Sequence, residues 1–457
     1  MVEDKIQVAV EIQPALEDHT GVGWYLYELL NNIDRSEIEI IGNYFNFLNR
    51  HDYRKSLSNL DLKYNKLQYV PYRIYKILTE KYNVSYNLFF RKKTDVYHFT
   101  RYILPNNIKG KVILNIYDLV FEKYVETMES KNRESFKRSF YKSVKRADQI
   151  ITISESSKNE LIEILKVPEN KIHIVQPGID FQKFNTKNSK FTKNVILKYS
   201  LPEDYILYLG TLEPRKNISS IIRAYGSLRN SNKITEKLVI AGKKGWLFSE
   251  IFDLIKSLDL GNEVILTDYV DESDKPAIYQ NAKLFVFPSL YEGFGMPILE
   301  AMAAGIPVIT SNTSAMPEVA GDAAILVNPL SIEEISEAML ELMNNNKLSN
   351  ELISKGFDQC KKFTWSNSAN KLVEIYKKLK DEDISNVNLL HSRFIQADRS
   401  EKEKNIKEFS KNRNEAGIWI TTQIVEASLD IDFDMLYTEM STLDSLFQRF
   451  GRCYRSR

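Results

Sequence analysis

The strongest constraint on the fold is a regular alternation of short apolar runs with amphipathic stretches. In the first half of the chain, such apolar runs occur at 5–12, 95–100, 111–120, 148–154 and 171–180. Strands that alternate with helices are typical of a parallel, doubly wound sheet covered by helices. We therefore expect an α/β fold whose first Rossmann-like domain spans residues 1–180.

The same alternation restarts after a polar stretch at 181–200. The strands predicted there read YILYLG, KLVIAG, EVILTDYV, KLFVFPS, GIPVITS and AAILVN. Because both halves follow one rule of construction, the sequence predicts two tandem Rossmann-like domains with a cleft between them, the second over 181–365. A terminal helix and linker at 366–383 then lead to a segment of different character at 384–457.

Composition excludes several classes of protein. Hydrophobic residues make up 43% and charged residues 27% of the chain, which excludes a disordered or fibrous protein. The 62 Lys and Arg residues balance 61 Asp and Glu residues, so the net charge gives no overall case for nucleic-acid binding. The two cysteines, Cys360 and Cys453, lack zinc spacing, and no signal core or membrane-length apolar run occurs. These features favour a cytoplasmic protein.

Two segments fit a ligand site, because ligands of doubly wound sheets bind where strands end and helices begin. The first, GTLEPRKN at 210–217, places Arg215 and Lys216 at the mouth of a predicted helix. Two adjacent cations at a helix N-terminus can bind a diphosphate. An ordinary solvated loop with two exposed charges is the alternative, and this segment alone does not decide between them.

The second segment is PSLYEGFGMPILEAMAAGIPVIT at 288–310. Glu292 lies in a glycine-rich loop, and Glu300 follows eight residues later on a predicted helix that ends at Gly305. Glycines allow a ligand to approach the backbone closely. One carboxylate can then bind sugar hydroxyls and the other a ribose diol, although a glycine-rich turn with two exposed acids is also consistent.

The run YEGFGMPILEAMAAGIPVI resembles the E-x7-E signature of retaining GT-B glycosyltransferases, in particular family 4. The blocks GTLEPRKN, LVIAGKKGW, SAMPEVAGDAAILVNP and FTWSNSANKLVEIY are similar to further blocks of that family. The resemblance spans about residues 5–380. It implies that the second domain binds a nucleotide-sugar and the first domain an acceptor.

The resemblance also implies roles for individual residues. Arg215 and Lys216 would neutralise the donor diphosphate, Glu300 would bind the ribose, and Glu292 would bind the donor sugar. Backbone amides near the sugar and phosphate would come from Gly293, Phe294 and Gly295. In the first half, Gly21 and Gly23 match the family's glycine-rich loop beside the diphosphate.

The sequence departs from the family at the strand that reads VILNIYDL. Many members carry a histidine there, whereas this chain has Tyr117 followed by Asp118. Tyr117 could still donate a hydrogen bond to the sugar, and His98 could serve instead. A strand-end histidine whose hydrogen bonds are satisfied by the backbone is the alternative for His98. Thr211 is a second departure, since some members place a phosphate-binding arginine at that position.

The implied reaction is transfer of a hexose with retention at the anomeric carbon. The departing phosphate would help to deprotonate the acceptor, and no protein nucleophile, metal or cofactor is implied. DED at 381–383 and DID at 430–432 resemble a metal-binding D-x-D motif, but neither follows a nucleotide-binding strand.

The blocks favour a GDP-mannose-like or UDP-linked donor and a surface-polysaccharide or lipid-linked acceptor. An epimerase or a phosphorylase on the same fold is less consistent with these blocks.

The segment at 69–93 mixes aromatic and basic residues. It reads either as an amphipathic domain helix with a solvated face or as a helix resting on the inner face of an anionic membrane. The sequence therefore leaves a peripheral membrane contact open.

Residues 389–457 resemble a fragment of the second RecA-like domain of Cas3-type CRISPR-associated helicases. TTQIVEASLDIDFD and QRFGRCYR are similar to two helicase motifs, in which Arg449 and Arg452 would reach ATP. The phosphate-binding motif G-x-x-x-x-G-K-[ST] does not occur in the chain, so we expect no helicase activity. We interpret the tail as a fusion or truncation relic. The alternative is a tail that recruits a partner or associates with nucleic acid.

Overall fold

The computed structural model forms two compact units, Met1–Tyr376 and Lys377–Arg457, which are described separately. Within them, the structure describes residues 5–17, 21–60, 62–90, 94–124, 133–245, 248–381, 387–390 and 418–421.

The first half of the larger unit is built on a seven-stranded parallel sheet with the order β3-β2-β1-β4-β5-β6-β7. Its strands are β1 Ile6–Glu11, β2 Ile38–Phe45, β3 Lys63–Leu67, β4 Val96–Phe99, β5 Lys111–Asn115, β6 Gln149–Thr152 and β7 Ile172–Ile174. Inner strands such as β4 and β6 are buried at every position, as expected for a sheet covered on both faces. The polar strand β3 forms one edge of the sheet.

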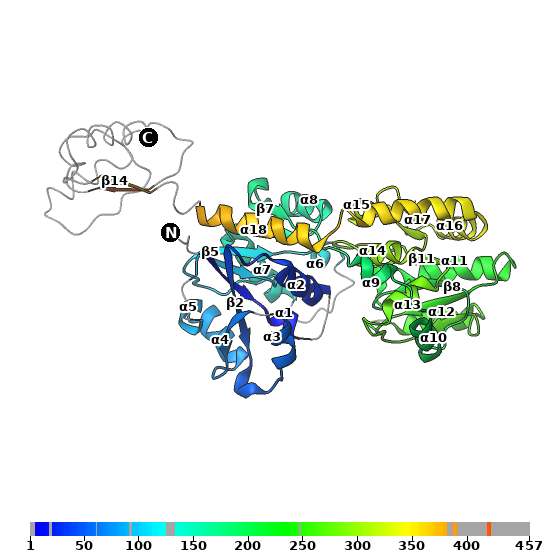
Figure 1. Ribbon diagram of the computed structural model, residues 1–457, viewed down its shortest axis with the longest axis horizontal. Helices are drawn as coiled ribbons and strands as arrows, with labels where there is room; N and C mark the ends of the chain where they lie inside the picture. The colour runs from blue at the N-terminus through cyan, green and yellow to red at the C-terminus, as the bar shows by residue number, and fades with distance from the viewer. Residues whose placement is uncertain are drawn as a thin grey trace. The chain divides into compact units, whose positions relative to one another are not determined.

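Helices connect these strands and cover the sheet (Figure 1). They are α1 Gln13–Leu16, α2 Gly21–Asn32, η1 Phe47–Asn49, α3 Arg54–Leu60, α4 Tyr72–Glu80, α5 Tyr86–Phe89, α6 Val120–Lys123, α7 Arg133–Arg146, α8 Glu155–Glu163 and η3 Glu169–Lys171. The Ser154 hydroxyl caps helix α8 by accepting a hydrogen bond from the Ser157 amide at 3.0 Å.

The second half is built on a six-stranded parallel sheet with the order β10-β9-β8-β11-β12-β13. All six predicted strands are present, as β8 Tyr205–Leu209, β9 Lys237–Ala241, β10 Val264–Leu266, β11 Leu284–Phe287, β12 Val308–Ser311 and β13 Ile325–Val327. The helices are α9 Phe181–Asn185, α10 Ser189–Lys198, η4 Pro214–Lys216, α11 Ile218–Asn230, α12 Ser249–Ser257, α13 Lys275–Gln280, α14 Met296–Ala304, α15 Met316–Ala320, α16 Ile332–Asn344, α17 Asn346–Cys360 and α18 Trp365–Asp381. The expected α/β fold with two Rossmann-like sheets is confirmed.

Two chain segments cross between the halves and pack tightly against each other. A Cβ atom on Gly178 would lie 2.2 Å from the backbone nitrogen of Trp365, so only glycine fits there. The Ile179 amide donates a hydrogen bond to the Phe363 carbonyl at 3.0 Å. After this crossing, α18 returns to the first sheet (Figure 1), where the Tyr376 hydroxyl lies 2.7 Å from Nδ1 of the buried His98.

The aromatic-basic segment at 69–93 forms α4 and α5, and residues 91–93 lie outside the described part of the chain. Tyr75 and Tyr86 are buried in the core of the first half, whereas Ile74 and Ile77 remain about half exposed. The helices are thus amphipathic domain helices with one apolar solvent-facing strip. A membrane contact of this strip stays a prediction.

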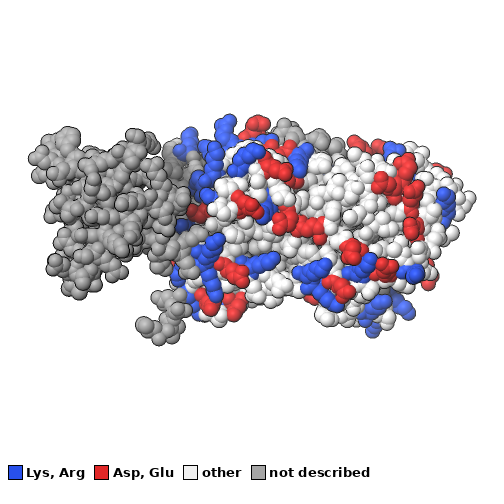
Figure 2. All heavy atoms as spheres, turned by 90° about the horizontal axis from the view of Figure 1, so that it is seen from above, with Lys and Arg blue, Asp and Glu red and all other residues white. Residues whose placement is uncertain are grey.

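Surface charge follows the balanced composition. On the face shown in Figure 2, basic and acidic side chains are interspersed. In the described part of the chain, no helix combines the length and the apolar character that crossing a membrane requires.

The smaller unit contains two described strands, β14 Val387–Leu390 and β15 Ile418–Thr421, which pair in parallel. Both helicase-like motifs fall almost wholly outside the described residues.

Candidate active site

Two loops at adjacent strand ends form the centre of the candidate site. One follows β8 and contains Glu213, Arg215 and Lys216, and the other follows β11 and contains Glu292 and Gly293. β8 and β11 are neighbours at the point where the strand order of the second sheet reverses. A crevice opens at this position in doubly wound sheets, so the fold brings both loops to the usual ligand edge.

Hydrogen bonds to backbone carbonyls hold the two loops together. The Leu290 amide donates to the Arg215 carbonyl at 2.9 Å, and Nη1 of Arg215 donates to the Tyr291 carbonyl at 2.6 Å. Asn217, in the left-handed region with φ 58°, donates from Nδ2 to the Pro288 carbonyl at 3.0 Å. The two predicted segments therefore form a single site.

A compact network of charges occupies this site. The Glu292 carboxylate accepts from Nζ of Lys216 at 2.6 Å and from Nη1 of Arg215 at 2.9 Å. Nη2 of Arg215 donates to Glu213 at 2.6 Å. The side chains of Glu292, Lys216 and Arg215 are 9%, 13% and 17% exposed, so little water screens these ion pairs.

The network sets the protonation of its members. Burial alone would raise the pKa of Glu292, but Arg215 and Lys216 outweigh burial and lower this pKa to about 2. Glu292 therefore remains ionised at neutral pH. Burial lowers the pKa of Lys216, although Glu292 opposes that effect. The site thus holds two cations whose charge an anionic ligand could share.

Gly293 and Gly295 of the second loop are each required for a different structural reason. Gly295 precedes α14 with φ +112°, in the region that favours glycine. A Cβ on Gly293 would lie 2.8 Å from the Tyr117 carbonyl oxygen and 3.0 Å from Cβ of Asp118. Gly293 therefore allows the loop of the second sheet to contact the end of β5 in the first sheet. Phe294 is buried, and its ring packs edge-to-face on Phe363 at 5.6 Å.

Asp118 belongs to this same site. Burial raises the pKa of its carboxyl, while the nearby Arg215 guanidinium acts in the opposite direction. The Tyr102 hydroxyl donates to Oδ1 of Asp118 at 3.3 Å. The structure thus brings Asp118, from the first sheet, together with Arg215 and the Glu292 loop of the second sheet.

Glu300 lies on α14 and is 8% exposed. Its carboxylate accepts from the Tyr279 hydroxyl at 2.8 Å and lies 3.5 Å from Nζ of Lys275. Lys275 also pairs with Glu272, at 2.5 Å. These contacts fix the Glu300 carboxylate, and the ribose contact expected from the resemblance stays a prediction.

The two candidate sugar contacts of the first half have partners within the protein. Both ring nitrogens of the buried His98 are engaged, Nδ1 with Tyr376 and Nε2 with Oδ1 of Asn115 at 2.8 Å, and burial lowers its pKa to about 4. The Tyr117 hydroxyl donates to the Thr100 carbonyl at 2.9 Å. A contact of either side chain with a donor sugar stays a prediction.

Gly21 and Gly23 lie in the first turn of α2 rather than in a loop, and residues 18–20 before them are outside the described part of the chain. A Cβ on Gly21 would meet no atom within 4 Å. Their position beside a diphosphate stays a prediction. Across the described residues, no group of three or more His, Cys, Asp or Glu side chains is arranged to hold a metal ion.

Sequence reasoning missed the residues that join the Glu292 loop to the first sheet. The Tyr291 hydroxyl donates to Glu160 at 2.6 Å and accepts from the Leu119 amide at 3.0 Å. Nζ of Lys123 also donates to Glu160, at 2.7 Å. Tyr291 directly precedes Glu292, but no local pattern shows that its partner lies 131 residues away.

Comparisons with known protein families agree with this architecture. The model described as "Glycosyltransferase Family 4" matches residues 19–183, and the model for glycosyl transferases group 1 matches residues 190–359. The model for the C-terminal part of the CRISPR-associated nuclease/helicase Cas3 matches residues 359–457. The predicted resemblance of both parts of the chain is thereby confirmed.

Individual proteins extend these matches. The chain is 30% identical to O-antigen chain mannosyltransferase B of Escherichia coli over 288 residues, 63% of this chain and 75% of that protein. It is 31% identical to the serotype-specific mannosyltransferase WbdA of Escherichia coli over 301 residues, 64% of this chain but only 36% of that protein.

Among solved structures, HepE of Anabaena in complex with UDP-glucose matches with a TM-score of 0.64 at 14% identity, covering 82% of this chain and 100% of that one, and this likeness shows a shared fold. With the two family models covering both Rossmann-like halves, the chain belongs to the family 4 glycosyltransferases of the GT-B fold, with a Cas3-like segment at its C-terminal end.

Proposed function

We propose that this chain transfers a hexose, with mannose favoured, from a GDP- or UDP-linked donor to a glycan or lipid-linked acceptor in surface polysaccharide biosynthesis. Two relatives named as mannosyltransferases support the sugar, and one of them is named for the O-antigen chain. The matched fold in complex with UDP-glucose supports a nucleotide-sugar as donor.

The ion network at the strand switch point carries this proposal. Arg215 and Lys216 are held within hydrogen-bond distance of one carboxylate, at an edge where doubly wound sheets bind nucleotides. A donor diphosphate can form ion pairs with Arg215 and Lys216 that partly replace their ion pairs with Glu292. As the bond to the sugar breaks, charge grows on the departing phosphate, and prepositioned cations stabilise that charge without reorganising.

We further propose that the sugar is transferred with retention and without a metal. The two cations supply the charge stabilisation that a metal supplies elsewhere. Both Glu292 oxygens already accept hydrogen bonds from cations, which weakens Glu292 as a nucleophile and suits it to orient sugar hydroxyls. The departing phosphate oxygen would then accept the acceptor proton on the same face of the sugar.

Replacing Lys216 or Glu292 by alanine is expected to lower the rate of donor hydrolysis by at least about tenfold, because each change removes a charge from the transition state. Nucleoside diphosphate release from GDP-mannose and UDP-glucose measures this rate. Lys283→Ala is the matched control, since this half-exposed lysine pairs with Asp204 at the opposite end of β11. Equal rates in all variants would refute the site assignment.

The ion network also predicts a pH effect. Glu292→Gln removes the negative charge that opposes the effect of burial on Lys216. The Lys216 pKa therefore falls further, and the lysine loses its proton at lower pH. The alkaline limb of the pH profile of kcat/KM for the donor should therefore move to lower pH. Asp204→Asn, which neutralises a distant paired carboxylate, should leave the limb in place. An unshifted limb in Glu292→Gln would contradict the coupling of these two charges.

Deleting residues 384–457 is expected to change donor hydrolysis by less than about twofold. The described site and both Rossmann-like sheets lie within the compact unit that ends at Tyr376. The same assay, run on purified full-length and shortened chains with matched melting temperatures, measures the effect. Loss of activity in a folded shortened chain would show that the Cas3-like segment contributes to catalysis.

A further inference from the structure

Helix α8 of the first half contacts the Glu292 loop on both sides of Glu292. The Glu160 carboxylate accepts from the Tyr291 hydroxyl at 2.6 Å, and Oγ of Ser157 lies 3.5 Å from the Gly293 carbonyl oxygen. Glu160 and Ser157 are three residues apart, so they lie on one face of the helix. The residues directly before and after Glu292 therefore both contact a helix that covers the first sheet.

The hydrogen bond between Tyr291 and Glu160 is the stronger of these two contacts. The Ser157 hydroxyl has one proton, which is directed to the Tyr117 carbonyl at the shorter distance of 3.0 Å. Tyr291 is 2% exposed and Glu160 is 4% exposed. Burial raises the pKa of Tyr291, so its hydroxyl keeps the proton that it donates. A hydrogen bond to a buried carboxylate is stronger than one between neutral groups.

The segment that follows β5 holds both members of this pair in place. The Leu119 amide donates to the Tyr291 hydroxyl at 3.0 Å, and the Tyr124 ring packs on the Tyr291 ring with their centroids 5.4 Å apart. Nζ of Lys123 donates to the second oxygen of Glu160 at 2.7 Å. The Tyr291 side chain is thus anchored in the first half, although its backbone belongs to a loop of the second half.

This anchor restricts where Glu292 can lie. Tyr291 and Glu292 share one planar peptide unit, so the backbone of one residue cannot move far without the other. The Tyr291 carbonyl accepts from Arg215, and the Glu292 amide donates to Oγ of Ser314 at 2.9 Å. A displacement of about 1 Å in a group that orients a substrate can lower the rate about 100-fold.

We propose that Tyr291 and Glu160 are positioning residues, whose hydrogen bond sets the place of Glu292 at the donor sugar. The inference rests on the proposed function, in which Glu292 orients sugar hydroxyls, and it assigns part of that task to a helix of the first half. Tyr291 and Glu160 act through the loop backbone and not by touching the donor. The pair should therefore affect turnover more than binding of the nucleoside diphosphate, which depends on Arg215 and Lys216.

Donor hydrolysis and nucleotide binding by the full chain test this separation. Tyr291→Phe removes the hydroxyl and keeps the ring, and it is expected to lower kcat for GDP-mannose or UDP-glucose at least about tenfold. The Kd of GDP or UDP should change less than about twofold. Glu160→Ala should act as Tyr291→Phe does, whereas Glu160→Gln keeps an oxygen that accepts from Tyr291 and should retain most of kcat.

The two residues should also act as one unit. The double variant Tyr291→Phe/Glu160→Ala is expected to have the kcat of the weaker single variant within about twofold, since both changes remove the same interaction. An unchanged kcat in Tyr291→Phe, equal losses of kcat and nucleotide affinity, or losses that multiply in the double variant would each overturn the proposal.

Hydrogen exchange of the full chain without donor tests the same contact independently of turnover. The peptide that covers residues 288–295 should exchange at least about tenfold faster in Tyr291→Phe than in the unmodified chain, because the loop opens more easily without its anchor. Equal exchange in both chains would overturn the proposal. If the unmodified chain hydrolyses neither donor, the proposed function fails, and the exchange measurement still decides whether the pair fixes the loop.

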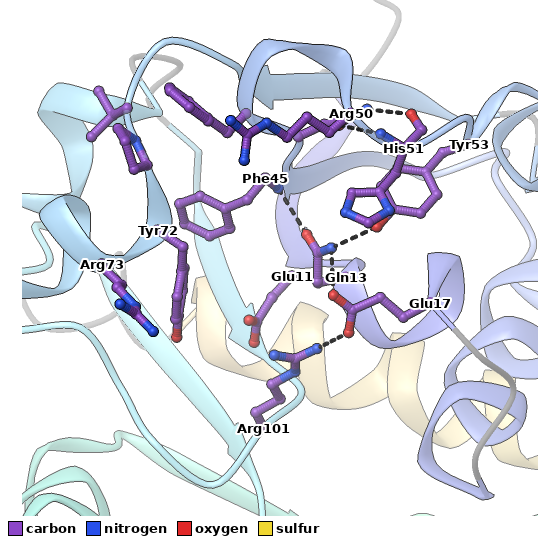
Figure 3. A pocket seen from close by; sticks show the side chains of 14 residues that line it. Glu11, Gln13, Glu17, Phe45, Arg50, His51, Tyr53, Tyr72, Arg73 and Arg101 are labelled. Carbon is purple, nitrogen blue, oxygen red and sulfur yellow. Dashed lines mark hydrogen bonds and ion pairs between the residues drawn. The ribbon is translucent and has the colours of Figure 1, made fainter.

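Two other tyrosines provide matched controls. Tyr225 is buried in the second half, and its hydroxyl donates at 2.9 Å to the carbonyl of Glu236, which precedes β9 and so lies at the strand ends opposite the site. Tyr53 lines a pocket of about 390 Å³ in the first half, where its hydroxyl accepts from Gln13 at 3.3 Å (Figure 3). Tyr225→Phe and Tyr53→Phe should leave kcat, nucleotide binding and loop exchange within about twofold of the unmodified chain.

Discussion

The pairing of Glu292 with Arg215 and Lys216 is the interaction around which the candidate site is organised. Three nearly buried charges lie at the switch point of one sheet, where each would be costly without the others. Glu292 holds the two cations in place through a hydrogen bond to each of them. The backbone bonds between the two loops follow from the same requirement, since a small displacement of either loop would separate the charges.

The first sheet is tied to this network through a few close contacts. Gly293 permits the close approach of Asp118. The hydroxyl of Tyr291, the residue directly before Glu292, donates a hydrogen bond to Glu160. The two halves are also joined where the chain segments at Gly178 and Trp365 pack together, and where Tyr376 of α18 contacts His98 of the first sheet. Asp118 of the first half and Gly293 of the second lie side by side.

Much of this arrangement could be predicted from local patterns. The six strands of the second sheet are apolar runs bounded by glycine, proline or polar residues, and the E-x7-E loop is a contiguous motif. β2 and β3 were missed, and β3 in particular is polar because it forms an exposed edge. The hydrogen bond between His98 and Tyr376 joins residues 278 positions apart, and the Tyr291–Glu160 contact joins residues 131 positions apart. Local periodicity carries no information about such long-range pairs.

The claim most in need of a direct measurement is that Arg215 and Lys216 bind a nucleoside diphosphate. Calorimetric titration of GDP and UDP into the full chain, compared with Arg215→Ala, measures this binding without depending on turnover or on the acceptor. At least one of the two nucleotides is expected to bind at a single site. Its affinity should fall at least about tenfold in the variant, as expected when a charged hydrogen bond to phosphate is lost. Absence of binding by either nucleotide, or equal affinity in Arg215→Ala, would contradict this claim.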